Sequence, residues 1–586
     1  MIAPRLAWLL PEPLPDPPAF TGFGRPVATL LARRGFHDDD QLQAFLIAGA
    51  GTLHPIALMA DAERALDRID AAIDEGERIA IWGDYDADGM SAIAVWVVAL
   101  RELGVAVERY VPSRWAEGYG LSRAGLETLA GRGVALVITC DCGVSNVDEV
   151  ELARSLGLDV IVTDHHLPAA TLPRAVAVVD PHRSDCDYPD PDLTGAGLAY
   201  KLAVALLARR SVVAADLAGI AAIGTVADLA PMTGESRAIV RIGLAELAET
   251  HRAGLRAMLA RAAEHPDHPT ARDLGYLIAP RVNAAGRIAD AELAIALLVS
   301  DDPDEAERLA DELEAVHRRR RELTSVAVSE ARALAGDALV GRGPLVIRND
   351  EWAPGLIGLI AGRLTDDLSR PVAVVTLVGD ELRGSVRAPA DFNVSAGLSA
   401  CAEYLTKLGG HAAAGGFSVS LGEWDRFVAA FEAVERPFPA GLHATPSATD
   451  GVSVDLVLPS AHLGWELAAQ LQRLEPYGPG HTEPILAVTG MQVAEARRIG
   501  GTEAHIAFRM RRGLEAFDAI AFGVPAERRL PAPETAIDLV GTLERDTFQG
   551  LERLRLRVLD YSDSAASPLV ARRRAVSPPL EAVAAR

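Results

Sequence analysis

The sequence predicts an α/β fold of two α/β domains joined by a long helix and followed by a small C-terminal β-barrel. Three observations lead to this prediction. Short apolar segments alternate with amphipathic ones between about residues 60 and 180, which is typical of a mostly parallel sheet covered on both faces. A long charged segment with helical periodicity at 301–335 separates this region from a second, shorter alternation. Beyond residue 484, short apolar runs alternate with Gly, Pro and charged turns, as in small barrels.

The elements follow from these patterns in chain order. In the first α/β region we expect helices at 62–75, 91–103, 124–130 and 147–156, and strands at 79–82, 105–111, 134–139, 160–162 and 175–179. In the second region we expect strands at 345–347, 372–377 and 417–419, and helices at 355–364 and 394–408.

The same patterns place the domain boundaries. Apolar-periodic runs before residue 50 indicate a helical leader, and the Ala-, Ser-, Pro- and Arg-rich end indicates disorder. The predicted parts are a leader at 1–55, the first α/β domain at 56–300, the connecting helix at 301–340, the second α/β domain at 341–445, the barrel at 446–561 and a disordered tail at 562–586.

Composition restricts the class of protein. The apolar runs are too short to span a membrane, and the proline-rich start lacks the features of a signal peptide. Four cysteines in 586 residues argue against a disulfide framework, so we expect a cytoplasmic protein. Cys140 and Cys142 flank Asp141, and a structural role fits them better than zinc binding. A net charge of −24 argues against diffuse nucleic-acid binding but allows a nuclease with a local metal site.

Carboxylates and histidines follow several of the apolar segments. The carboxyl ends of parallel strands meet at one edge of a sheet, where ligands bind, so these groups should converge there. The residues are Asp84, Asp86, Asp88, Asp141, Asp164, His165, His166 and Asp228, the last after the apolar run 220–223.

Such a set of ligands is suited to divalent metals. Oxygen ligands suit hard cations, and imidazole favours manganese over magnesium or calcium. Two ions about 3.5–4 Å apart can activate water and stabilise a phosphodiester during cleavage, and Asp141 is placed to bridge them. A calcium loop at 84–89 is the weaker alternative, because the distal Glu is missing. Asp164 could instead cap a turn, and either histidine alone could be a packed side chain.

Two motifs of the second α/β domain could bind phosphate. Arg383 to Arg387 offers two cations and a hydroxyl, and Gly409 to His411 offers bare backbone N–H groups and an imidazole. Either motif by itself is better explained as a tight turn. The run Arg318 to Arg321 is better explained as a solvated helix face than as a nucleic-acid contact.

Taken together, the strand-end residues resemble, in order and spacing, the four motifs of the DHH phosphoesterase superfamily. Further stretches resemble its RecJ family of single-strand-specific exonucleases, and the similarity covers about residues 25–560. These stretches are Pro112–Arg114, Glu117–Ser122, Pro280–Arg287, Lys407–His411 and Leu474–Gly480.

The resemblance implies a DHH-type domain, a DHHA1-type domain and an oligonucleotide-binding (OB)-like barrel. It also implies two Mn²⁺ or Mg²⁺ ions, with His166, Asp141 and His165 as the catalytic groups and His166 acting near the scissile phosphate. Trp82 stands where many members of the superfamily have a metal-binding His. The implied metal ligands are Asp86, Asp88, Asp141, His165 and Asp228, with Asp84 as a ligand or a neighbour of one. The implied nucleic-acid and phosphate contacts are Arg114, Arg281, Asn283, Arg287, Ser385, Arg387, Gly410 and His411.

The implied activity is metal-dependent 5′-to-3′ hydrolysis of single-stranded DNA to 5′-mononucleotides during recombination and repair. The implied partners are a single-strand binding protein and a helicase, and we expect a monomer. The main alternative is a DHH phosphodiesterase acting on short oligonucleotides or cyclic dinucleotides, although the length and the late barrel argue against it. A catalytically dead, strand-binding scaffold is a further alternative, which the complete acidic set argues against.

Overall fold

The computed structural model describes residues 1–569 apart from 115–116, 264, 342, 435–450, 502, 513–514 and 549–550. The chain forms two compact units. Unit 1 consists of Met1–Ile47, Thr445–Glu475 and Thr482–Arg586, and unit 2 consists of Ala48–Ala444 and Pro476–His481. Among the described helices, none is both long enough and apolar enough to cross a bilayer.

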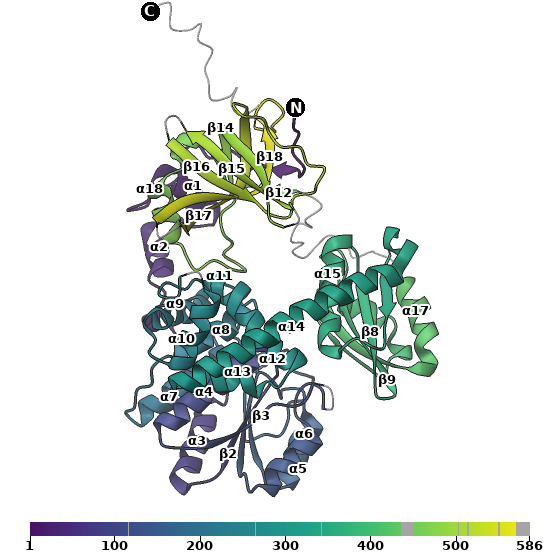
Figure 1. Cartoon of the computed structure of the whole chain (residues 1–586). Helices are drawn as coiled ribbons and strands as arrows, with labels where there is room; N and C mark the ends of the chain where they lie inside the picture. Colours follow the sequence, from purple (N-terminus) through teal and green to yellow (C-terminus); the bar gives the residue numbers. More distant parts are fainter. Residues whose placement is uncertain are drawn as a thin grey trace, which may run out of the picture. The chain divides into compact units, whose positions relative to one another are not determined.

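Unit 2 opens with a five-stranded parallel sheet in the order β3-β2-β4-β5-β6 (Figure 1). Every residue of β2 and β4 is buried, which explains why these interior strands are continuous apolar runs. The strands are β2 (Ile79–Gly83), β3 (Val107–Tyr110), β4 (Leu136–Cys140), β5 (Asp159–Thr163) and β6 (Ala177–Val179).

Helices cover both faces of this sheet, as the alternating pattern predicts. Helices α3, α4 and α7 pack with Ile79 and Ile81 in one core, and α5 and α6 pack with Ala80 and Val137 in another. Helix α4 begins four residues earlier than predicted, because the side chain of Asp86 caps its N-terminus. The helices are α3 (Ala62–Glu75), α4 (Ala87–Glu102), α5 (Arg123–Gly131), α6 (Val147–Ser155) and α7 (Gly195–Arg209).

A helical region completes the first domain and leads into the connecting helix α14 (Pro303–Ala335). Leu313 on α14 belongs to the core of the parallel sheet, whereas Ala327 belongs to the core of the second domain. Figure 1 shows α14 running between these two parts of unit 2. The other helices are α8 (Leu217–Ala227), α9 (Gly234–Glu249), α10 (Ala253–Ala262), α11 (Ala271–Asp273), the π-helical turn η3 (Leu274–Ile278), α12 (Ala279–Ile288) and α13 (Glu292–Val299).

The second domain contains a mixed sheet in the order β10-β11-β9-β8-β7. The helix predicted at 394–408 was wrong beyond its first turns, because residues 407–410 pair with β11 and form an edge strand. The elements are β7 (Leu345–Arg348), α15 (Pro354–Leu368), β8 (Val372–Val378), β9 (Glu381–Arg387), α16 (Val394–Ser399), β10 (Lys407–Gly410), β11 (Ala414–Ser420) and α17 (Trp424–Glu432).

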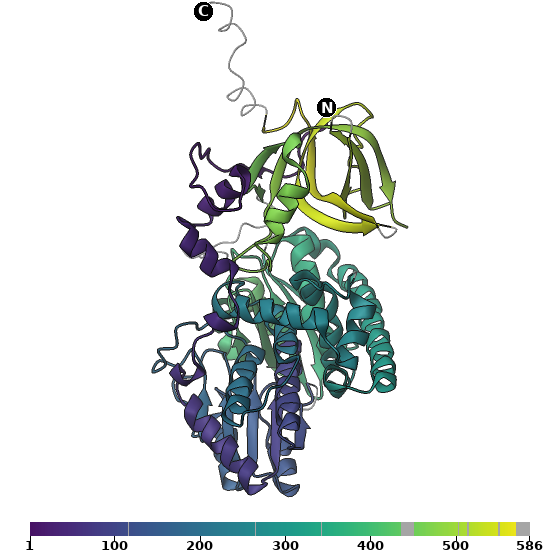
Figure 2. The ribbon, with the colours of Figure 1, turned by 90° about the vertical axis from the view of Figure 1, so that its left-hand side faces the viewer.

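Unit 1 contains a barrel that closes because β14 pairs with β15 on one side and with β17 on the other. The N-terminal segment belongs to this unit, and its purple ribbon lies against the barrel in Figure 2. Its strand β1 pairs in parallel with β12. The elements are β1 (Trp8–Leu9), α1 (Arg25–Arg33), α2 (Asp39–Leu46), β12 (Val452–Ser453), β13 (Leu456–Pro459), α18 (Trp465–Gln472), β14 (Leu486–Ile499), β15 (His505–Arg512), β16 (Glu515–Ala521), β17 (Ala536–Phe548) and β18 (Leu551–Asp563).

Disorder was predicted from residue 562, and this was wrong for 562–569. Ser562 continues β18, and Leu569 is fully buried in the core that contains Trp8. The rest of the predicted tail, 570–586, lies outside the described residues.

The predicted fold class is confirmed. The parallel-sheet domain, the smaller α/β domain on the connecting helix and the closed barrel are all present.

Candidate metal centre and nucleic-acid site

The predicted acidic residues and histidines gather at one edge of the parallel sheet. Asp84 follows β2, Asp141 follows β4 and His165 follows β5, as the strand-end rule requires. Asp228 also reaches this edge, but from the C-terminus of helix α8. Its apolar run was grouped with the strands, which was wrong, because a short apolar run does not distinguish a buried strand from a buried helix.

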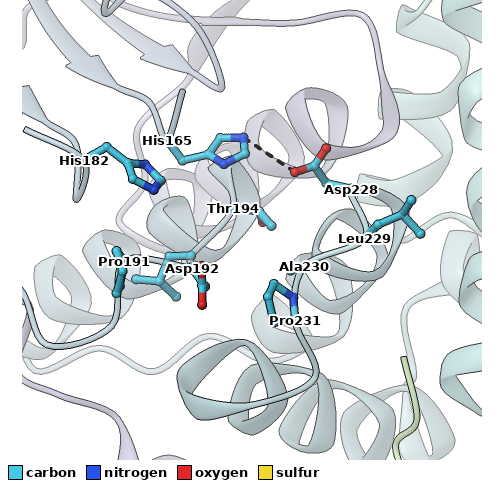
Figure 3. Close-up of a pocket in the computed structure, with 10 residues that line it drawn as sticks. His165, His182, Pro191, Asp192, Thr194, Asp228, Leu229, Ala230 and Pro231 are labelled. Carbon is cyan, nitrogen blue, oxygen red and sulfur yellow. Dashed lines mark ion pairs between the residues drawn. The ribbon is translucent and has the colours of Figure 1, made fainter. Parts of the chain in front are cut away.

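His165 lies at the centre of one group of possible ligands. Its Nε2 is 3.0 Å from Asp141 Oδ1, 3.7 Å from Asp228 Oδ2 and 3.8 Å from Asp88 Oδ2. Figure 3 shows the ring of His165 turned toward the Asp228 carboxylate. The ligand atoms of Asp88, His165 and Asp228 all lie within 4.8 Å of one another, close enough to surround a single cation.

A second group of ligands lies beside the first. The carboxylates of Asp84, Asp86 and Asp141 also lie within 4.8 Å of one another. Asp141 therefore belongs to this group and contacts His165 of the first, which is the arrangement that a bridging carboxylate requires. Its backbone has φ of +61°, in the left-handed region that non-glycine residues rarely adopt, and its N–H donates to Thr163 O at 3.0 Å.

Backbone N–H groups fix the orientation of two of these carboxylates. Asp86 accepts from the N–H groups of Asp88 and Gly89 at 2.9 and 3.1 Å. Asp88 accepts from Gly195 and Ala196 at 2.7 and 3.0 Å, at the N-terminus of α7, where the helix dipole favours negative charge. The first turns of α4 and α7 thus hold the site.

The carboxylates are costly to ionise where they lie. Burial, followed by the charge of Asp86, raises the pKa of Asp84 to about 8 and that of Asp228 to about 6. Burial also raises the pKa of Asp88 and Asp141 well above the ordinary range, and neighbouring carboxylates add to the effect. Within the described residues, Asp84 Oδ1 is buried without a hydrogen-bond partner.

These observations fit a site for hard divalent cations. Cations would compensate the mutual repulsion of the carboxylates and would supply the partner that Asp84 Oδ1 lacks. The donor set of carboxylate oxygens with one imidazole suits Mn²⁺ or Mg²⁺.

The two adjacent histidines differ in charge: one imidazole ring is neutral and the other is protonated. Burial lowers the pKa of His165 to about 4, so its ring is neutral and able to act as a ligand. Burial also disfavours the charged form of His166, but the hydrogen bond from its Nδ1 to Asp164 Oδ1 at 2.8 Å prevails and raises its pKa to about 9. His166 Nδ1 is also 3.1 Å from the hydroxyl of Tyr119. His166 is therefore cationic at neutral pH.

Asp180 and His182 also lie near the site and were missed. Asp180 is fully buried directly after β6, so the strand-end rule could have identified it. Its Oδ1 accepts from the N–H of His182 at 2.7 Å. His182 lines a pocket of about 160 Å³ that also contains His165 and Asp228, two of the candidate metal ligands (Figure 3). The pocket is lined by His165, His182, Pro191, Asp192, Leu193, Thr194, Asp228, Leu229, Ala230 and Pro231.

Trp82 occupies the core and contributes no ligand to the site. Its ring is fully buried and stacks on Tyr110 with centroids 4.2 Å apart, and its Nε1 donates to Gly120 O at 3.3 Å. The side chain at this position is thus a packing residue.

Several of the predicted phosphate contacts come together where the two α/β domains of unit 2 meet. The guanidinium of Arg114 lies 4.3 Å from the ring centroid of Tyr85, and Arg383 of β9 donates to Arg114 O at 3.3 Å. Arg387 donates to Ser385 Oγ at 3.0 Å on the same strand, so this motif is an extended strand and not a tight turn. Arg287 donates to Gly355 O at 3.3 Å.

The remaining predicted contacts are arranged differently. Arg281 forms an ion pair with Glu314 at 2.7 Å, and Asn283 Oδ1 accepts from the N–H of Ala87 at 3.1 Å. Both side chains therefore already have protein partners. Gly410 and His411 are exposed at the end of β10, and Gly410 has φ of +138°, where a Cβ would lie 2.4 Å from Gly415 Cα.

Comparison with known protein families assigns three segments of the chain. Residues 78–225 match the DHH family, N-terminal domain, residues 339–436 match the DHHA1 domain and residues 454–560 match the RecJ OB domain.

Individual relatives match over most of the chain. The single-stranded-DNA-specific exonuclease RecJ of Escherichia coli is 32% identical, over 90% of this chain and 94% of its own. The Bacillus subtilis protein of that name is 32% identical over 92% of this chain and 68% of its own. The crystal structure of Thermus thermophilus RecJ in complex with Mn²⁺ superposes with a TM-score of 0.79 at 29% identity, over 95% of this chain and 80% of that one. A Mg²⁺ complex of the same protein gives a TM-score of 0.74 at 28% identity, over 95% and 79%.

Proposed function

Because this chain belongs to the RecJ family of DHH-type, single-stranded-DNA-specific exonucleases, we propose that it removes nucleotides from the 5′ end of the strand. The chain is a single-stranded-DNA-specific exonuclease. The observation that carries this conclusion is the near-complete match to the Escherichia coli enzyme, barrel included. The products would be 5′-mononucleotides, and the setting would be DNA recombination and repair.

The enzyme uses Mn²⁺ or Mg²⁺, since RecJ has been crystallised with each ion and the carboxylate cluster fits both. We propose two ions, one held by Asp88, His165 and Asp228 and the other by Asp84 and Asp86, with Asp141 shared. When bound, such ions neutralise the charge of the phosphodiester and activate the attacking water.

The protein groups would position the substrate and handle a proton. His166 is cationic and partly exposed beside the cluster, so it can donate a hydrogen bond to the scissile phosphate or a proton to the leaving oxygen. Asp164 holds the imidazolium ring in place through the contact at Nδ1. Tyr119 fixes this geometry further, because its hydroxyl lies 3.1 Å from His166 Nδ1 and donates its hydrogen to Asp141 O at 3.0 Å.

The 5′-end polarity rests on the arginines at the meeting point of the two domains. Arg114, Ser385 and Arg387 would bind the terminal phosphate, because arginine binds phosphate bidentately and a hydroxyl can add a further hydrogen bond. A closed pocket for that phosphate would set the cut one nucleotide away. Exposed Gly410 and His411 could contribute from β10.

We further propose a monomer in the cytoplasm, working with a single-strand binding protein and a helicase. The four cysteines are unpaired, as expected in a reducing compartment.

A polarity assay tests the proposed function. Single strands labelled at the 5′ or the 3′ end, and the matching duplex, are incubated with the enzyme in Mn²⁺ or Mg²⁺. We expect immediate release of the 5′ label as a mononucleotide, gradual shortening of 3′-labelled strands from their 5′ end, and an intact duplex. Immediate release of the 3′ label would contradict the polarity, and equal degradation of the duplex would contradict the strand preference.

The phosphate anchor is tested by Arg387→Ala. The preference for a 5′-phosphate over a 5′-hydroxyl end should fall about tenfold, because a charge-assisted contact is lost. Arg363→Ala, an exposed arginine on α15, is the control. If Arg387→Ala keeps the wild-type preference, the anchor lies elsewhere.

A further inference from the structure

The run Arg318 to Arg321 on α14 contains one arginine that differs from its neighbours. Positions 313, 317, 320, 324 and 327 follow a spacing of three or four and share one face of the helix. Leu313, His317 and Ala327 on this face are buried. Arg320 is half-buried, whereas the other three arginines of the run are exposed. Only Arg320 in this run therefore lies on the inward face.

Arg320 lies where α14 passes from one α/β domain of unit 2 to the other. Leu313 packs in the core of the parallel-sheet domain and Ala327 in the core of the second domain. Figure 1 shows α14 running between these two parts of unit 2. One turn before Arg320, His317 Nδ1 is 3.2 Å from Pro280 O on the neighbouring helix α12. The same helix α12 carries Arg281 and Arg287.

The surroundings of Arg320 contain an excess of positive charge. Burial lowers the pKa of Arg287 to about 9, and the charges of Arg114, Arg320 and Arg387 act in the same direction. Glu314, which precedes Arg320 on the same helix, is already paired with Arg281. Across the part of the chain that the structure describes, Arg320 Nε is buried without a hydrogen-bond partner, and the side chain forms no ion pair.

A buried guanidinium N–H without an acceptor is unfavourable, and a polyanion would supply both the acceptor for Nε and the opposite charge. A DNA strand is the polyanion that this enzyme takes in. Guanidinium groups match the geometry of phosphate oxygens, and several arginines around one position can hold successive phosphates.

We propose that Arg320 binds a backbone phosphate of the single strand beside Arg287, which makes it a substrate-binding residue supplied by the connecting helix. This inference rests on the proposed function. It assigns one arginine of the run to the substrate and leaves the other three on a solvated helix face.

The run itself provides the matched control. Arg319 is an exposed neighbour whose ion pair with Glu322, 3.8 Å long, is too exposed to contribute much stability. Arg320→Gln, Arg320→Lys and Arg319→Gln are compared with the wild type. Binding to a 3′-labelled oligothymidine is measured in EDTA over a series of salt concentrations, so that cleavage does not interfere.

Arg320→Gln should weaken binding about tenfold and reduce the slope of log K against log [salt] by about 0.7, the contribution of one phosphate contact on a single strand. Arg320→Lys should keep the slope while losing part of the affinity, and Arg319→Gln should match the wild type. The slope does not depend on the fraction of folded protein, so partial unfolding of a variant would not imitate this result.

An unchanged slope for Arg320→Gln, or an equal loss for Arg319→Gln, would overturn the inference while leaving the nuclease assignment intact. A wild-type protein that neither binds nor degrades the strand would overturn both.

Discussion

Replacement of Asp84 by asparagine should stabilise the metal-free protein while weakening its response to metal. Burial and Asp86 raise the pKa of Asp84 to about 8, from the 3.8 of an ordinary aspartate. A carboxyl group whose folded pKa is raised contributes stability at low pH that is lost as the pH rises through the folded value. At about 1.4 kcal/mol per pH unit, the loss between pH ~4 and ~8 is at most about 6 kcal/mol.

Asparagine has nearly the same shape and no charge, so Asp84→Asn should avoid this loss. We expect a gain of at least about 2 kcal/mol near pH 8, which corresponds to a rise in Tm of about 4–8 °C for a domain of this size, and a clearly smaller gain near pH 5. The assay is thermal unfolding in EDTA at both pH values, followed by titration with Mn²⁺. Manganese should raise the Tm of the wild type more than that of the variant.

Asp366→Asn serves as the control, because Asp366 is exposed on α15, away from the site. If Asp84→Asn is no more stable than the wild type near pH 8, or is equally more stable at both pH values, the carboxylate cluster is not under the electrostatic strain that we infer.

Two further predictions concern the geometry of the site and its proton. Gly195→Ala should reduce turnover roughly 100-fold, because the added Cβ would lie 2.6 Å from Asp141 Cβ and displace this carboxylate. Gly197→Ala on the same helix is the control and should retain activity, because its Cβ meets no atom closer than 3.4 Å. Equal steady-state rates for the two variants would contradict the role of Asp141. Activity should fall as the pH rises through about 9, where His166 loses its proton. Asp164→Asn should move this fall to lower pH, because it removes the charge that raises the pKa of His166. A pH–rate profile that Asp164→Asn leaves unchanged would contradict the role of His166 as a cation.

Sequence patterns were sufficient to locate the five strands of the parallel sheet, the helices α3 to α6 and the edge on which the chemistry lies, but not the helices between residues 195 and 299. Alternating apolar runs specify a parallel sheet, and the topology of such a sheet brings the ends of its strands together. Asp84, Asp141 and His165 could therefore be grouped from the sequence, because each comes shortly after a strand.

Packing in three dimensions settled which side chains share space and which already have partners. Asp228 arrives from a helix, Arg281 is neutralised by Glu314, and Asn283 supports the turn at Ala87. The sequence likewise does not show that Arg320 faces inward, because that depends on the packing of α14 against the cores of both domains. Local patterns record burial and periodicity along the chain, whereas the packing of distant helices decides which charges meet and which remain without an acceptor.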